Sequence, residues 1–192
     1  MKILFPLMKR DEFMFEYNKE VIERILKIEG FNIDNINMVK HVPMHQYRII
    51  NKDKPLLLIE NLQVCIGLYA YSKEFGYAAH LNPVVIRGDE FVVDKFKNIK
   101  HCNRVEELYK EIIKANPKNE VYIGISIGCN PTYKTYIVVD MLNILIDKLI
   151  VKLKKIGINA IKLDLENNHI FIVDSINEKI IIPQEKQLLK KR

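Results

Sequence analysis

Five short runs of apolar and β-branched residues follow one another in the first half of the chain, and they constrain the fold more than any other feature. The runs cover residues 38–42, 46–50, 56–59, 64–71 and 77–81. Turn-forming segments separate some of them, namely Asn-Lys-Asp-Lys-Pro at residues 51–55 and Ser-Lys-Glu at residues 72–74. Such short polar connections favour antiparallel neighbours. The sequence therefore predicts a sheet built largely from hairpins.

The second half of the chain predicts two helices with a strand between them. Asn103 and Glu106 have the spacing of a capping box, which favours a helix that begins at Asn103. Residues 121–127 are expected as a strand, and residues 136–156 as a long helix with apolar residues on most sides. A helix of that kind is covered from more than one direction. Further strands are expected at residues 158–165, 170–173 and 179–182.

The order of these elements favours an α+β fold, because hairpins outnumber strand–helix–strand units. We expect a layered α/β sandwich with a mostly antiparallel or mixed sheet. An apolar segment at residues 2–8, followed by a helix capped by Asp11 and ended at Gly30, predicts an N-terminal strand–helix extension. The expected organisation is this extension over residues 1–55, a main domain over 56–183 and a basic tail over 184–192.

The composition is that of a globular protein without structural staples. The chain has 192 residues, 48% hydrophobic and 28% charged, which excludes a wholly disordered chain. Cys65, Cys102 and Cys129 are far apart and form no C-x-x-C pair, so we expect reduced thiols, no metal site and no cofactor. The most apolar stretch, residues 136–153, contains five Asp, Asn and Lys residues, which argues against a membrane span. We expect a cytoplasmic protein.

The charge of the chain is a weaker indication of function. Lys and Arg number 30 against 24 Asp and Glu, a net charge of +6, and lysines cluster at residues 152–155 and 190–192. Basic clusters can bind nucleic acid, but the sequence has no Gly-rich RNA-binding run and no zinc module. Nucleic-acid binding is therefore a subordinate hypothesis, and a solvated lysine-rich surface is favoured.

A cysteine and a histidine lie on two neighbouring predicted strands. With a turn near residues 73–74, Cys65 and His80 fall roughly opposite each other. An imidazole that takes the proton of a thiol creates a thiolate, which attacks carbonyl carbons. The two residues are therefore a candidate catalytic pair. Since cysteine is common in protein cores, a buried structural pair is the alternative.

A second pattern, Gly-Ile-Ser-Ile-Gly at residues 124–128, matches the G-x-S-x-G of hydrolase nucleophile elbows. That elbow requires a helix directly after the serine, whereas Pro131 delays a helix here. Ser126 is therefore expected in a strand whose small residues permit close packing.

The segment from Gly67 to Pro83 resembles the chemoreceptor glutamine deamidases, the CheD family. The chain has Gly-Leu-Tyr at residues 67–69 and Gly-Tyr-Ala-Ala-His-Leu-Asn-Pro at residues 76–83. The family has a Cys-Val-x-Val-Cys-Leu-Tyr-Asp strand, then Gly-Gly-x-Ala-His and a Leu-Pro loop. The resemblance extends in weaker form over residues 56–183. It implies a layered α/β fold and a Cys–His mechanism that deamidates glutamine side chains of proteins.

Only part of the family's site is carried over by this resemblance. His80 falls on the catalytic histidine, but Gln63 stands at the position of the catalytic cysteine and Leu57 at that of the histidine-orienting threonine. Cys65 lies two residues beyond Gln63, about 6–7 Å along a strand. This favours a non-catalytic, protein-binding relative. The alternative is a cysteine amide hydrolase or glutamine deamidase, in which Cys65 and His80 act on a glutamine-bearing protein. In that case Gln63 and Asn82 would contact the substrate.

Overall fold

The structure, a computed structural model, describes residues 38–50, 53–60, 62–73, 75–87, 90–93, 95–168 and 170–182, together with Glu23 and Lys27. The chain divides into two compact units, Met1–Met38 with Pro183–Arg192 and Val39–Ile182. The sheets, helices and sites below belong to the second unit. The predicted N-terminal strand and basic tail lie outside the described residues, as does the N-terminal helix apart from Glu23 and Lys27, which are helical.

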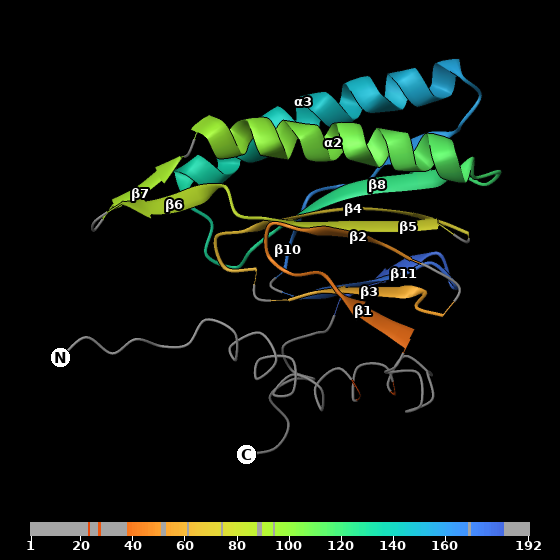
Figure 1. The fold of residues 1–192 in the computed structure, drawn as a ribbon, viewed down its shortest axis with the longest axis horizontal. Helices are drawn as coiled ribbons and strands as arrows, with labels where there is room; N and C mark the ends of the chain where they lie inside the picture. Colours follow the sequence, from red (N-terminus) through yellow and green to blue (C-terminus); the bar gives the residue numbers. More distant parts are fainter. Residues whose placement is uncertain are drawn as a thin grey trace. The chain divides into compact units, whose positions relative to one another are not determined.

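The second unit is built from helices and two sheets in layers (Figure 1). The larger sheet has the order β10 (Glu166–Asn167), β8 (Val121–Ile127), β4 (Ile66–Ser72), β5 (Phe75–Leu81) and β2 (Tyr47–Ile49), and β9 (Ala160–Lys162) also pairs with β8. The smaller sheet has the order β1 (Val39–His41), β3 (Leu56–Ile59), β11 (Phe171–Asp174) and β12 (Lys179–Ile181). Helices α2 (Lys95–Ala115) and α3 (Tyr133–Lys155) cover one face of the larger sheet, and β6 (Val84–Arg87) and β7 (Glu90–Val93) form a separate hairpin.

Both sheets are mixed, which agrees with the expected α+β class. Strand β4 is antiparallel to β5 and β8, whereas β9 and β10 run parallel to β8. In the smaller sheet, β1 runs parallel to β3, and β11 is antiparallel to both β3 and β12. Strands β1 and β2 come from the segment expected to precede the main domain, and each is hydrogen-bonded into one of the two sheets.

The side chains of β4 alternate between two hydrophobic cores. Ile66 and Leu68 pack with residues of α2 and α3, whereas Tyr69 and Tyr71 pack with residues of the smaller sheet. All residues of β4 and β5 are buried. Strands that are covered on both faces have nearly continuous apolar sequences. Residues 66–72 therefore lack the alternation of polar and apolar residues that is typical of a half-exposed strand.

Both helices begin at residues other than those expected. Helix α3 starts at Tyr133, because Thr132 and Thr135 form a capping box at its N-terminus. Helix α2 starts at Lys95, so the prediction that Asn103 opens this helix is wrong. The segment between Lys95 and Asn103 contains no glycine or proline, and the helix runs through the capping-box pattern. Among the described residues, no helix combines the length and the apolar character needed to cross a membrane.

Candidate functional site

His80 lies opposite Gly67 in the β4–β5 ladder, and the prediction that it lies opposite Cys65 is two residues out of register. Cys65, two residues before Gly67, is therefore a diagonal cross-strand neighbour of His80, and such neighbours are about 7–8 Å apart between Cα atoms. Cys65 belongs to the core between the two sheets, as does Ala78, which shares a face of β5 with His80. The two candidate catalytic residues therefore lie on one face of the sheet without being direct partners.

The ring of Phe171 fills the space beside Gly67. A Cβ added at Gly67 would lie 2.5 Å from Phe171 Cε1 and 3.3 Å from a methyl carbon of Leu62. Phe171 also packs against Tyr69, with ring centroids 5.1 Å apart. Because Gly67 has no side chain, β11 can place its aromatic ring against β4 between the positions of Cys65 and His80. This packing encloses the candidate pair in the core.

Burial makes His80 a neutral imidazole at neutral pH. Its exposed fraction is 3%, and neither ring nitrogen has a hydrogen-bond partner among the described residues. The pKa of His80 is lowered from 6.5 to about 4, chiefly by burial and in addition by the nearby His41 and His45. An imidazole with so low a pKa is almost entirely unprotonated at pH 7, so it is a poor acceptor for the proton of a thiol.

A turn from Pro43 to Gln46 covers the end of β5 next to His80. The backbone N–H of His45 donates to the His80 carbonyl at 2.8 Å, and the His80 N–H donates to the Gln46 carbonyl at 3.0 Å. Met44 forms an isolated bridge with His80. The Asn82 side-chain amide donates to Met44 Sδ at 3.6 Å, so Asn82, predicted to contact substrate, lies against this same turn.

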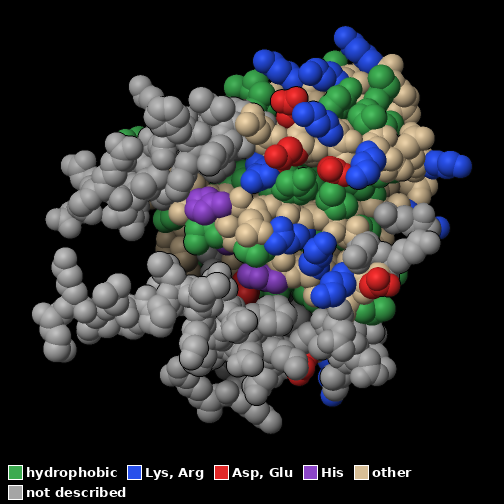
Figure 2. Space-filling model, viewed as in Figure 1, with side chains coloured by type: hydrophobic (Ala, Val, Ile, Leu, Met, Phe, Trp, Pro, Cys, Tyr) green, Lys and Arg blue, Asp and Glu red, His purple; other side chains and the backbone are tan. Residues whose placement is uncertain are grey.

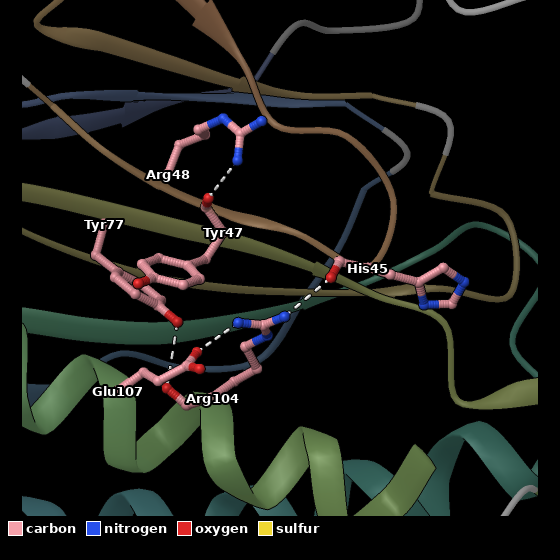
Figure 3. A network of polar contacts seen from close by, with 6 residues as sticks. All are labelled: His45, Tyr47, Arg48, Tyr77, Arg104 and Glu107. Carbon is pink, nitrogen blue, oxygen red and sulfur yellow. Dashed lines mark hydrogen bonds and ion pairs between the residues drawn. The ribbon is translucent and has the colours of Figure 1, made fainter. Parts of the chain in front are cut away.

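Helix α2 holds this turn in place through Arg104 (Figure 3). The guanidinium donates to the His45 carbonyl at 2.9 Å, forms an ion pair with Glu107, and lies 5.1 Å from the centre of the Tyr47 ring. The Tyr77 hydroxyl donates to the Arg104 carbonyl at 3.2 Å. Helix, turn and β5 are therefore linked in one polar network at the edge of the closed region around His80.

Gln63, which the resemblance to the CheD family aligns with the catalytic cysteine, is exposed and hydrogen-bonded to a neighbouring loop. Its side-chain oxygen accepts from the Cys129 thiol at 3.3 Å and from the Asn130 amide at 2.8 Å. Backbone bonds from Gly128 to Cys65 (2.9 Å) and from Asn130 to Gln63 (3.1 Å) fix the loop after β8 against the segment before β4. Gln63, Cys129 and Asn130 form one exposed polar surface, called here the Gln63 surface.

Gly128 permits the close approach of these two segments. A Cβ at Gly128 would lie 2.0 Å from the backbone oxygen of Gln63. Because that oxygen belongs to the backbone, no rotation of a side chain can relieve the contact. Sequence reasoning missed the contacts of Cys129 and Asn130 with Gln63, although the Gly-Cys-Asn-Pro run directly after a strong strand indicates a loop.

The other residues that the sequence singled out, Leu57 and Ser126, are buried inside strands. Leu57 is buried in β3 opposite Val173, so no hydroxyl from this position can orient His80. Ser126 lies inside β8 opposite Gly67 and is buried, as expected for a strand and not for a nucleophile elbow. Within the described residues no group of three or more His, Cys, Asp and Glu side chains is placed to hold a metal ion.

Cys65 and His80 are buried in the core, whereas the Gln63 surface is exposed. Cys65 is only 5% exposed, so a protein substrate would meet very little of this residue at the surface. Comparison of the chain with protein-family models and with curated proteins finds no match.

Proposed function

We propose that this chain is a non-catalytic, protein-binding relative of the CheD-like deamidases, which keeps their layered fold and binds a partner protein through the Gln63 surface. The observation that carries the proposal is the position of Gln63. An amide stands where the nucleophilic thiol would be, and Cys129 and Asn130 hold it in place. An amide cannot form the covalent intermediate that a cysteine nucleophile forms.

The state of His80 supports the same proposal. A catalytic base must reach the proton that it abstracts, directly or through one water, and must have a pKa near the working pH. His80 is buried, its pKa is about 4, and Leu57 supplies no orienting hydrogen bond. These observations support the proposal that residues which would serve catalysis in the family serve packing in this chain.

The Gln63 surface supports binding because its polar groups are exposed and rigidly positioned. The loop backbone is bonded to residues 62, 63 and 65 at 2.9–3.1 Å, so a partner would meet preformed groups and lose less entropy on ordering them. Amide side chains recognise backbone and amide groups of another protein through paired hydrogen bonds. The resemblance makes a glutamine-bearing protein segment, such as the cytoplasmic helices of a chemoreceptor, the first partner to test.

The direct test is binding of a purified chemoreceptor cytoplasmic fragment, followed by isothermal titration calorimetry. Gln63→Ala should weaken binding about tenfold, since it removes a group with two hydrogen bonds at the surface. Gln46→Ala is the matched control, because it makes the same change at another exposed glutamine and should leave the affinity unchanged. No binding by the unaltered chain, or equal losses in both variants, would exclude this partner surface.

A further inference from the structure

One face of helix α3 presents apolar side chains away from the protein core. Tyr133, Ile137, Ile144 and Val151 are 71%, 54%, 56% and 53% exposed, whereas Leu142, Ile146 and Leu153 on the same helix are buried. These four residues are called here the outer stripe of α3. In Figure 2, apolar side chains lie among Lys, Asp and Glu side chains in the part of the view where α2 and α3 lie in Figure 1.

The outer stripe has the spacing of a helix–helix seam. Ile137, Ile144 and Val151 are seven residues apart, and at about 100° per residue they fall within roughly 40° of one another around the helix. The stripe runs from Tyr133 to Val151, about 27 Å along the helix axis. Isolated exposed apolar residues are ordinary, but four that share one side of a helix mark a surface that a second helix can cover.

The residues around Ile144 are arranged symmetrically. Ile137 and Val151 lie seven residues before and after it, and Asp140 and Lys148 lie four residues before and after it. Asp140 and Lys148 are both exposed, and neither makes an ion pair with another described residue. An antiparallel second copy of α3 centred on Ile144 would bring Ile137 against Val151, and each Asp140 against the Lys148 of the other copy.

Charge selects this arrangement over a parallel one. A parallel pair would bring Asp140 against Asp140 and Lys148 against Lys148, and like charges at that distance repel. The antiparallel pair instead makes two equivalent opposite-charge contacts, as a two-fold interface requires. It also brings Lys155 of each copy towards Tyr133 of the other, since these residues lie eleven positions on either side of Ile144.

We propose that the outer stripe of α3 is a self-association surface, through which two copies of this chain pair as antiparallel helices about a two-fold axis at Ile144. The inference is independent of the proposed function, because the outer stripe faces away from the sheet and the Gln63 surface takes no part in it. A single helix pair is a small interface, so the dimer is weak, with a dissociation constant on the order of 10 µM.

The test is sedimentation equilibrium of the full chain from 1 to 200 µM, together with charge variants. The unaltered chain should pass from monomer to dimer across this range. Asp140→Lys and Lys148→Asp should each abolish the dimer, because each creates two like-charge contacts. The double variant D140K/K148D should restore it, because the charges are exchanged and the contacts are again opposite in sign. Restoration is specific to antiparallel pairing of identical helices.

Two further variants separate the stripe from general surface effects. Ile144→Asp places two carboxylates at the two-fold axis and should leave only monomer, while Ile113→Asp on α2, also at an exposed isoleucine, should leave the dimer intact. Circular dichroism checks that each variant is folded. A chain that stays monomeric at 200 µM, a dimer that survives Ile144→Asp, or a double variant that stays monomeric would each overturn the proposal. Association of the stripe with a different protein, without self-association, would also overturn it.

Discussion

His80 pairs with Gly67 across the β4–β5 ladder, and the ring of Phe171 occupies the space that a larger residue at position 67 would fill. Cys65 lies one diagonal step from His80, within the same core. The pair is therefore close in the sheet yet closed to solvent, with exposed fractions of 5% and 3%. Its position favours a structural role, and the exposed groups nearest in sequence to Cys65 belong to the Gln63 surface.

Protonation of His80 should make the fold sensitive to acid. The unfolded chain binds this proton below about pH 6.5, but the folded chain resists it until about pH 4, so folding stability falls as the pH drops through this interval. The full loss is about 3 kcal/mol. His80→Leu should remove that share of the pH dependence, measured by urea unfolding at pH 7, 6, 5 and 4. The matched control, His45→Asn at an exposed histidine, should keep most of it. A slope unchanged in His80→Leu would contradict the account.

The contact between Gly128 and Gln63 should tolerate no side chain. Gly128→Ala forces a Cβ within 2.0 Å of a backbone oxygen, so we expect a loss of about 3 kcal/mol in the free energy of unfolding. Gly157→Ala is the comparison, because its φ of +85° is strained for alanine but nothing lies within 4 Å of its Cβ. That change should cost about 1 kcal/mol. Denaturant titration checks both, and a smaller effect at Gly128 than at Gly157 would refute the close approach.

Arg104 should contribute more to stability than an ordinary surface cation. Arg104→Leu removes a bond to the His45 carbonyl, an ion pair and a cation–π contact, and should cost about 2 kcal/mol. Lys110→Leu removes an exposed ion pair with Glu106 on the same helix, and should cost no more than about 0.5 kcal/mol. Thermal unfolding compares the two variants. Equal effects would mean that the network in Figure 3 does not hold the turn beside His80.

The cysteines should differ in reactivity as their exposure differs. In a Cys102→Ser background, iodoacetamide at pH 7.5 should modify the exposed Cys129 in the folded chain and the buried Cys65 only after unfolding. Mass spectrometry of timed samples distinguishes the two sites. Rapid labelling of Cys65 in the folded chain would show an accessible thiolate and would support the hydrolase alternative.

The sequence predicted the elements whose signal is local. The strands at residues 56–59 and 121–127 lie at β3 and β8, because buried strands in this fold read as compact apolar runs. The start of α2 was misplaced, because Asn103 and Glu106 have capping-box spacing in the interior of a helix. The segment 158–165, expected as one strand, contains only the three-residue strand β9, and β10 lies just beyond it at Glu166–Asn167.

The site was harder to predict because its contacts are long-range. Cys129 and Asn130 meet Gln63 across 66 and 67 residues of sequence, and only the β4–β8 pairing brings the two segments together. The proximity of Cys65 and His80 was predictable from a short hairpin, but its register was not, since a shift of two residues keeps both side chains on the same face. Burial of the pair depends on Phe171, which lies ninety-one residues beyond His80.

Ammonia release from a glutamine-bearing chemoreceptor fragment tests the central claim most directly. The unaltered chain, Cys65→Ala and His80→Ala should all release no more ammonia than the fragment alone, because Cys65 and His80 are buried and the proposed function assigns Gln63 to the position of the nucleophile. Ammonia release by the unaltered chain that is lost in both Cys65→Ala and His80→Ala would contradict the account and establish a Cys–His deamidase.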